Sequence, residues 1–257
     1  MRSKHSEGKN LKFSHFILWL FRLVCIGIMC YSGFKIYTWH KENVENDKLK
    51  NSFQNTITEE KVIVDGRNAY KLNIDFEELL KRNSETVGWI KVNNTNIDYP
   101  IVRHNDNEYY LTHNFENSYN SSGWIFLDYR NNSEILDKNT IIYGHNRLND
   151  SMFGTLKNAL DSSWCDNYEN RYISFSTTTN NYVAQIFSIY KIDVNTLSVP
   201  NNFKDNEDYN KYLEDITSKS YYNFETTVDT SNNILTLYTC GDNSNYRVIV
   251  HAKILDI

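Results

Sequence analysis

Proline is scarce in this sequence, which contains two prolines among 257 residues. Tyrosine is frequent by contrast, with nineteen residues, and this combination indicates a β-rich folded body and not a disordered chain. An excess of positive charge is also missing. The formal net charge is −5, so the composition gives no sign of nucleic-acid binding.

Cysteine is scarce as well, and its four positions carry no metal-binding pattern. Cys25 and Cys30 fall inside an apolar stretch near the N-terminus, which leaves Cys165 and Cys240 for the rest of the chain. No CxxC pair or histidine-rich spacing occurs, so the sequence implies no metal site and no cofactor. Cys240 has two interpretations at this point: half of a disulfide with Cys165, or a reactive thiol.

The N-terminal region combines a basic tail, residues 1–12, with an apolar run over residues 13–39. The run exceeds the roughly 20 residues that cross a bilayer as a helix, although Arg22 interrupts it. The bulky, basic stretch Tyr31–Lys35 offers no small-residue cleavage site, so the sequence predicts a transmembrane signal anchor, with a cleaved signal peptide as the alternative. A retained basic tail predicts a single pass through the cell membrane, a cytoplasmic N-terminus and an extracellular C-terminal domain.

Charged and then strand-like patterns follow the apolar run. Residues 40–72 predict a polar helical stalk, and residues 73–257 predict an extracellular domain that opens with a short amphipathic helix capped by Asp75. About eight strand-like runs separated by turn-rich linkers then indicate a mostly β domain, a closed barrel or a sandwich, with two helical interruptions. The expected strands are Trp89–Val92, Ile97–Val102, Gly123–Leu127, Thr140–Tyr143, Tyr172–Ser176, Asn181–Ile192, Asn233–Cys240 and Arg247–Ile254. The expected helices are Met152–Leu160 and Asn206–Lys219.

Cys240 and Arg247 end and begin two consecutive strand-like runs. If these runs pair as an antiparallel hairpin through the loop Gly241–Tyr246, the thiol and the guanidinium meet at the loop end, on one face of the sheet. A positive charge there favours the thiolate and steadies the oxyanion of a tetrahedral intermediate. The alternative for Arg247 is a surface arginine paired with Asp242 or another carboxylate.

A catalytic thiol also needs a base, because an unperturbed cysteine, with a pKa of about 8.5, is mostly protonated at neutral pH. His251 lies on the expected face, but four residues along a strand place it about 13 Å away. His145 is the stronger candidate, since Gly144 lets the backbone turn and present the imidazole at the end of an apolar strand. His104 and His113 lie in polar, loop-like segments and are interpreted as ordinary loop residues.

These motifs together resemble the sortases, the cysteine transpeptidases of Gram-positive surfaces. The element Thr-Leu-x-Thr-Cys, which ends at Cys240, with Arg247 downstream, is highly specific for that family, whereas Gly-His-Asn at residues 144–146 is weak alone. Other stretches resemble class B sortases in particular: Val87–Val92, Thr95–Pro100, Tyr109–His113 and Phe126–Arg130. The resemblance extends from about residue 73 to the C-terminus and implies a closed eight-stranded sortase-type β-barrel with short peripheral helices. The seven positions from Cys240 to Arg247 are a short spacing for the family.

The resemblance also implies roles for individual residues. Cys240 is the implied nucleophile, His145 its partner and general acid for the leaving amine, and Arg247 the group that orients substrate and steadies the oxyanion. The implied substrate-binding positions are Asn107, Leu111 and Thr239. Ordinary loop and core packing is the alternative for these positions.

The implied activity is cleavage of a C-terminal sorting signal after Thr, followed by transfer of a thioacyl intermediate on Cys240 to an amine. The expected partners are surface proteins that carry the signal, a peptidoglycan precursor or protein amine as acceptor, and the membrane. Two alternatives stay open. One is a cysteine hydrolase that passes the acyl group only to water, and the other is an anchored, non-catalytic module that binds peptide or glycan.

Overall fold

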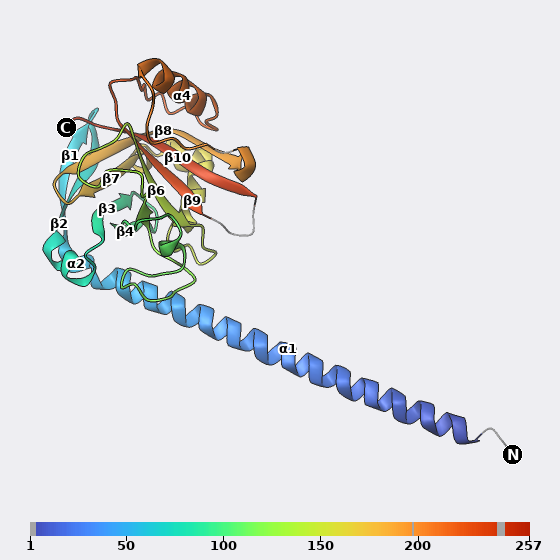
Figure 1. Ribbon diagram of the computed structural model, residues 1–257. Coiled ribbons are helices and arrows are strands. Elements are labelled where there is room, and N and C mark those ends of the chain that lie inside the picture. Colours follow the sequence, from blue (N-terminus) through green and yellow to red (C-terminus); the bar gives the residue numbers. More distant parts are fainter. Residues whose placement is uncertain (1–3, 197, 241–244) are drawn as a thin grey trace. The chain divides into compact units, whose positions relative to one another are not determined.

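The structure, a computed structural model, describes residues 4–196, 198–240 and 245–257 (Figure 1). The chain divides into two compact units, Met1–Glu45 and Asn46–Ile257. Residues 1–3 of the predicted basic tail lie outside the described residues. So do residues 241–244 of the predicted hairpin loop, which include the alternative arginine partner Asp242.

Helix α1 (Lys4–Ser52) contains the whole apolar run. Its apolar side chains between Phe16 and Trp39 are exposed, and no part of its most apolar window is buried in the protein. The helix is long and apolar enough to cross a membrane. These properties suit both a membrane anchor and a signal sequence, so the anchor stays a prediction.

The second half of the predicted helical stalk is a β-hairpin. Helix α1 ends at Ser52, the 3₁₀ turn η1 (Gln54–Thr56) follows, and β1 (Ile57–Val64) pairs antiparallel with β2 (Arg67–Ile74). The prediction of a helix as far as residue 72 is therefore wrong beyond Ser52.

The hairpin has a local cause in the sequence. Asp65 and Gly66 have φ angles of 50° and 75°, and a type I′ hairpin turn needs positive φ at both central positions. The hairpin then buries Val64 and Ala69 in a small apolar cluster with Tyr172 and other side chains of the barrel. An Asp-Gly turn between two alternating runs was the overlooked indication of this element.

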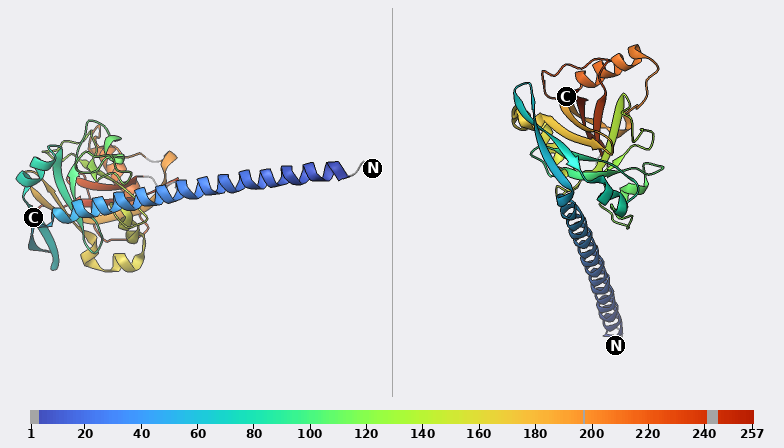
Figure 2. Two further views of the ribbon diagram at one scale, coloured as in Figure 1. Left: turned by 90° about the horizontal axis from the view of Figure 1, so that it is seen from below. Right: turned by 90° about the vertical axis from the view of Figure 1, so that its left-hand side faces the viewer.

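Within the described residues, eight strands close into a barrel in the order β10-β8-β7-β3-β4-β5-β6-β9 (Figures 1 and 2). The strands are β3 (Thr86–Val92), β4 (Asp98–Val102), β5 (Phe126–Leu127), β6 (Asn139–His145), β7 (Tyr172–Thr177), β8 (Asn181–Asp193), β9 (Ile234–Cys240) and β10 (Tyr246–Ile254). The pairs β4–β5 and β6–β9 are parallel, and the other pairs are antiparallel. The prediction of a closed eight-stranded β-barrel is confirmed.

Short helices surround the barrel, as predicted. In α2 (Phe76–Arg82) the predicted cap is present, since the Asp75 side chain accepts from the Glu78 backbone N–H at 3.2 Å. The other short elements are η2 (Tyr109–Leu111), η3 (Gly154–Leu160), α3 (Ser162–Asp166), η4 (Tyr168–Arg171), η5 (Val194–Thr196) and α4 (Asn206–Ser218).

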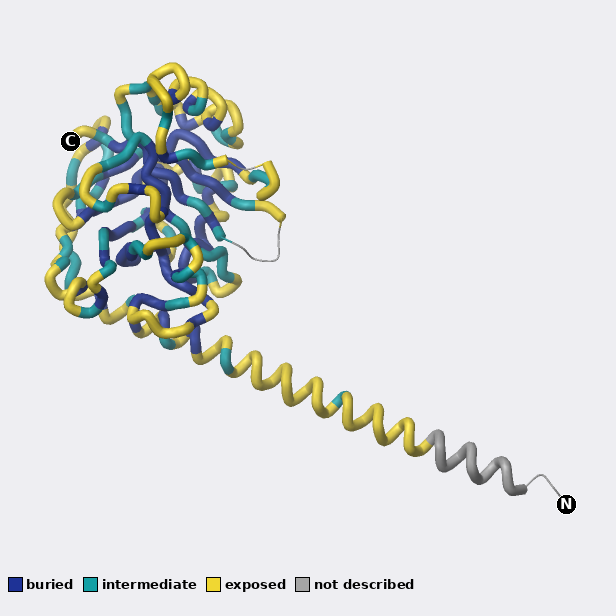
Figure 3. Tube along the Cα trace, in the orientation of Figure 1, coloured by how far each residue is buried: buried dark blue, intermediate teal, exposed yellow. Residues whose placement is uncertain are grey.

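Two apolar clusters hold the barrel and α4. The larger cluster includes alternate side chains of the strands, such as Leu235, Leu237 and Val250, and it forms the buried centre seen in Figure 3. A second cluster joins α4, through Leu213 and Ile216, to side chains of β8, β9 and β10. The two faces of β9 therefore have different neighbours, as strand alternation requires.

Candidate active site

Cys240 and His145 lie side by side at the ends of two parallel strands. The register of β6 against β9 pairs His145 with Cys240 directly. Paired residues of neighbouring strands are about 4.8 Å apart and project to the same face. The Asn146 N–H donates to the Cys240 carbonyl at 3.1 Å, so the pairing continues one residue beyond β6. The structure thus brings the predicted thiol and imidazole together.

Gly144 is needed for packing and not for a turn. It lies within β6, and a Cβ atom there would meet the Ile125 side chain at 2.5 Å and the Phe153 ring at 2.7 Å. The Phe153 N–H also donates to the His145 carbonyl at 2.9 Å. The expected backbone turn at Gly144 is therefore wrong, because the glycine makes room for two side chains behind the strand.

The ring of His145 is held from the segment that contains η2. Its Nε2 lies 2.8 Å from the Leu111 carbonyl oxygen, which can only accept, so Nε2 carries a proton. In the neutral ring, Nδ1 is then the acceptor nitrogen. Gly123, at φ +58°, permits the close approach on another side, since a Cβ there would lie 3.0 Å from His145 Cδ2. Leu111 therefore contributes its backbone carbonyl to the site.

Arg247 lies on the strand beside Cys240. The antiparallel register of β9 and β10 pairs Tyr238 with Ile249, and the same register places Arg247 opposite Cys240 two residues further on. Between these pairs, the Thr239 hydroxyl accepts from the Val248 N–H at 2.9 Å and lies 3.2 Å from the Val248 carbonyl. The side chain of Thr239 is buried, so it bridges two strands and does not line the pocket.

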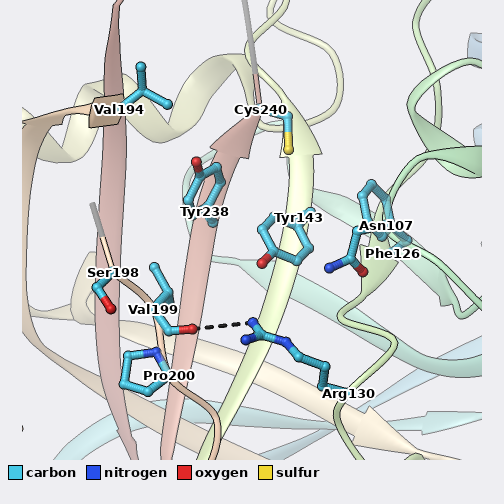
Figure 4. A pocket seen from close by; sticks show the side chains of 10 residues that line it. All are labelled: Asn107, Phe126, Arg130, Tyr143, Val194, Ser198, Val199, Pro200, Tyr238 and Cys240. Carbon is cyan, nitrogen blue, oxygen red and sulfur yellow. Dashed lines mark hydrogen bonds between the residues drawn. The ribbon is translucent and has the colours of Figure 1, made fainter. Parts of the chain in front are cut away.

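A pocket of about 590 Å³ opens beside the thiol (Figure 4). Asn107 is one of its lining residues; its Oδ1 accepts from the Tyr129 N–H at 3.0 Å, and its amide nitrogen points toward Tyr143. The lining residues are Asn107, Phe126, Arg130, Tyr143, Val194, Ser198, Val199, Pro200, Tyr238 and Cys240. Three aromatic rings and the irregular segment before α4 therefore form most of the pocket lining beside the thiol.

An ion pair holds one of the side chains that line this pocket. Arg130 donates to both carboxylate oxygens of buried Asp128, at 2.8 and 2.6 Å, and the Tyr143 hydroxyl donates to Asp128 at 2.8 Å. Burial alone favours the neutral acid, but the bonds from Arg130 and Tyr143 outweigh it and hold the pKa of Asp128 below its usual value. This arrangement fixes both pocket side chains, Arg130 and Tyr143, through one carboxylate.

The thiol of Cys240 is a poor acid in this environment. Burial raises its pKa to about 12, while the charge of Arg247 and a backbone hydrogen bond from Gly144 act in the lowering direction. At pH 7 a pKa of about 12 leaves about one thiolate in 10⁵ molecules. Burial thus outweighs the charge of Arg247 in setting the direction of this shift.

Cys165, His251 and His104 each make other contacts. Cys165 and Cys240 are both free, and buried Cys165 contacts the Ala159 carbonyl at 3.2 Å. His251 is fully buried, and burial lowers its pKa to about 3. His104 contacts the Glu85 carboxylate at 2.7 Å.

Comparison with known proteins identifies the family. The Sortase domain model matches residues 90–255, which is more than half of the chain. The chain belongs to the sortase family. It is 32% identical to sortase B of Listeria monocytogenes over 258 residues, which covers 99% of each protein. This similarity makes it a sortase B-type cysteine transpeptidase, an enzyme of surface protein anchoring.

Solved structures agree with this sortase identity. The structure of sortase B from B. anthracis in complex with AAEK1 has 34% sequence identity and a TM-score of 0.73, covering 84% of this chain and 99% of that one. The Staphylococcus aureus sortase B–substrate complex has 34% identity and a TM-score of 0.67, covering 71% of this chain and 85% of that one. The fold assignment thus rests on sequence and on structure.

Several pocket residues of this sortase were missed by the sequence analysis. Tyr143 and Tyr238 each lie two residues before a predicted catalytic residue, on the same strand. Strand parity places residues two apart on one face, so this simple rule was available to find them. Arg130 follows the short strand β5 and gives no comparable periodic indication.

Proposed function

We propose that Cys240, His145 and Arg247 are the catalytic residues of this transpeptidase. The observation that carries the proposal is the register that pairs His145 with Cys240 beside a pocket lined by the same cysteine. Asn107 is a substrate contact through its amide nitrogen. Leu111 acts through its carbonyl, which holds the proton on His145 Nε2.

The substrate is a C-terminal sorting signal, cleaved after Thr. Cys240 Sγ attacks the carbonyl carbon of that Thr as its proton passes to His145 Nδ1, and the positive charge of Arg247 stabilises the oxyanion. When the tetrahedral intermediate collapses, the peptide C–N bond breaks and the amine leaves with the proton from Nδ1. An acceptor amine then attacks the thioester, gives a proton to His145, and releases Cys240.

The Leu111 contact favours this sequence of proton transfers. A carbonyl acceptor stabilises the imidazolium that forms on attack, because the Nε2–H bond is kept in both protonation states. Without such a step the thiol, with its pKa raised to about 12, is rarely ionised. The proposal therefore couples formation of the nucleophile to binding of the peptide.

The predicted location places this chemistry outside the cell. Residues 13–39 cross the membrane once, the basic tail stays in the cytoplasm, and the barrel meets surface proteins and the amine acceptor of a peptidoglycan precursor or another protein. The apolar, exposed helix α1 supports this arrangement. Intact mass of the protein from membranes tests it, since a cleaved signal peptide shortens the chain.

A library of Thr-containing peptides tests the activity, with products identified by mass. We expect wild type to cleave one class of peptide after Thr, to form a thioacyl adduct, and to ligate an added amine. Cys240→Ala should do none of these. Cleavage by this variant at the wild-type rate would contradict the proposal. Cleavage without any ligated product would assign a hydrolase instead.

A further inference from the structure

One wall of the catalytic pocket is an irregular segment. Val199 and Pro200 line the pocket together with Cys240, and they lie between η5 and α4 (Figure 4). We call residues 199–201 the pocket wall. Backbone outside helices and strands is held in place by the individual hydrogen bonds that its carbonyl and N–H groups form. The side chains that supply these bonds therefore set the shape of this part of the pocket.

Three side-chain hydrogen bonds hold the pocket wall. Asn139 Nδ2 donates to the Pro200 carbonyl at 2.7 Å, and Arg130 Nη2 donates to the Val199 carbonyl at 3.2 Å. In the opposite direction, Asn201 Nδ2 donates to the backbone carbonyl of Arg130 at 3.0 Å. Asn139 and Asn201 are themselves buried, and loss of either amide removes one hydrogen bond that holds the pocket wall.

The bond from Asn139 ends a buried chain of hydrogen bonds with a defined direction. An amide oxygen can only accept, so the Thr236 hydroxyl donates to Asn139 Oδ1 at 2.6 Å and accepts from His251 Nδ1 at 2.8 Å. His251 is neutral, and its Nε2 therefore accepts from the Tyr190 hydroxyl at 2.9 Å. Every donor in the chain points from Tyr190 toward the pocket wall.

This chain crosses four neighbouring strands of the barrel. Tyr190 is on β8, His251 on β10, Thr236 on β9 and Asn139 on β6, and these strands are adjacent in that order. The pocket wall is therefore tied to the part of the barrel that also carries the paired strand ends of the catalytic residues. Aligned hydrogen bonds polarise one another, so the last bond to the wall is strengthened by those before it.

We propose that Asn139 is a specificity-determining positioning residue of this transpeptidase. It holds the Pro200 carbonyl, and with it the pocket wall, at the end of the Tyr190–His251–Thr236 chain. Two further hydrogen bonds hold the neighbours of Pro200. Arg130 donates to the Val199 carbonyl, and Asn201 donates to the Arg130 carbonyl. Asn139 is not among the residues that line the pocket. The inference rests on the proposed function, because the ligand of the pocket is the sorting peptide.

The test uses the full-length chain in detergent, with the Thr-containing peptide that wild type cleaves fastest as substrate. We expect Asn139→Ala to raise KM about five- to tenfold, the effect of one lost hydrogen bond, with kcat within about twofold of wild type. Asn201→Ala, which removes the hydrogen bond to the Arg130 carbonyl, should act in the same direction if Asn139→Ala folds poorly. Both variants should also broaden the peptide preference across the library.

Asn170→Ala is the matched control. Asn170 is a buried asparagine whose Nδ2 donates to the Trp164 carbonyl at 2.8 Å, and it is not among the pocket residues. Its variant should keep the wild-type KM and peptide preference. Alkylation of Cys240 by iodoacetamide should proceed at the wild-type rate in all three variants, because this small reagent needs no pocket wall.

Hydrogen exchange separates this inference from the proposed function. The backbone of residues 198–203 should exchange faster in Asn139→Ala than in wild type or Asn170→Ala, whatever the activity. A folded Asn139→Ala and a folded Asn201→Ala with wild-type KM, peptide preference and exchange would overturn the inference. A wild type that cleaves no peptide would overturn the proposed function alone, and exchange at residues 198–203 would still decide the role of Asn139.

Discussion

Burial and charge shift the pKa of the Cys240 thiol in opposite directions. Burial raises the pKa of the thiol to about 12, and Arg247 opposes this shift from the neighbouring strand. Because this pKa lies far above neutrality, the thiolate fraction grows about tenfold per pH unit over the range from pH 6 to 10. The thiolate fraction of Cys240 thus depends on the balance of burial and the Arg247 charge.

Substitution of Arg247 by Gln should lower the fraction of Cys240 that is present as thiolate. Loss of the positive charge raises the pKa of Cys240 further, so less thiolate is present at any pH. Since one pKa unit is a factor of ten in thiolate, we expect alkylation by iodoacetamide at pH 8 to slow by several-fold to about tenfold. Arg247→Lys keeps the charge and should stay near the wild-type rate. An unchanged rate in Arg247→Gln would show that the charge does not act on the thiol.

Gly123 offers a second prediction at a single residue. A Cβ atom there would lie 2.4 Å from the Tyr110 carbonyl and 3.0 Å from the ring of His145. We expect Gly123→Ala to lower the free energy of unfolding by about 1–3 kcal/mol and to lower kcat by displacing His145. Urea unfolding and peptide turnover measure the two effects.

Gly66 supplies the control for Gly123. It also has a positive φ, 75° against 58°, but a Cβ atom there would meet nothing within 4 Å. Gly66→Ala therefore carries the backbone strain without the contacts, and it should leave kcat unchanged. Equal losses of activity in the two variants would mean that the contacts around Gly123 are irrelevant to the site.

At the scale of elements, β8, β9 and β10 are joined by a buried histidine. His251 accepts from Tyr190 and donates to Thr236, and burial, with a smaller effect of the Lys219 charge, lowers its pKa to about 3. The unfolded chain binds a proton at this histidine near pH 6.5. The folded protein and the unfolded chain therefore differ in bound protons between about pH 6.5 and 3.

The pH dependence of stability should reveal this difference. Between pH 6.5 and 3 the unfolded chain binds the extra proton, so the free energy of unfolding falls as the pH is lowered through this range. We expect His251→Asn to show a smaller fall between pH 6.5 and 5, a range above most carboxylate pKa values. At pH 7–8 both proteins should have the same slope, because the histidine is neutral in both states. Equal slopes between pH 6.5 and 5 would contradict the burial of a neutral His251.

The elements differ in how far the sequence predicts them. The barrel strands follow from alternation, and the cap of α2 from Asp75. The hairpin β1–β2 was missed because its charged outer face resembles a polar helix more than a strand. The parallel pairing of β6 with β9 has no local signal at all, because it joins residues about 95 positions apart in the chain and depends on closure of the whole barrel.

The site shows the same division between local and long-range information. Cys240 and Arg247 belong to one predicted hairpin, and their proximity could be inferred from strand parity. His145 was chosen for its strand end, but its pairing with Cys240 comes from the barrel. Asn139, Arg130 and the pocket wall meet only in three dimensions, so their hydrogen bonds were beyond reach of the sequence.

At the scale of the whole molecule, the boundary of the catalytic unit lies inside α1. The second compact unit begins at Asn46, and the last turns of the helix contribute buried side chains to it. Phe53 is fully buried after the helix end, where its ring lies 4.7 Å from that of Phe115 and 6.3 Å from that of Trp124, and Arg82 stacks on it at 4.3 Å. The catalytic unit therefore begins inside α1, several residues before the helix ends.

Two truncations test this boundary. Deletion of residues 1–45 removes the apolar run and keeps Leu49 and Phe53, so we expect a soluble protein with the kcat/KM of the full chain on a soluble peptide. Deletion of residues 1–53 also removes both buried side chains, and loss of a buried Phe alone costs about 3–5 kcal/mol. Urea unfolding should show this loss, and Phe53→Ala in the longer protein should reproduce most of it. If both truncated proteins unfold at the same urea concentration, the end of α1 is only a connector, because the barrel then holds its core without Phe53.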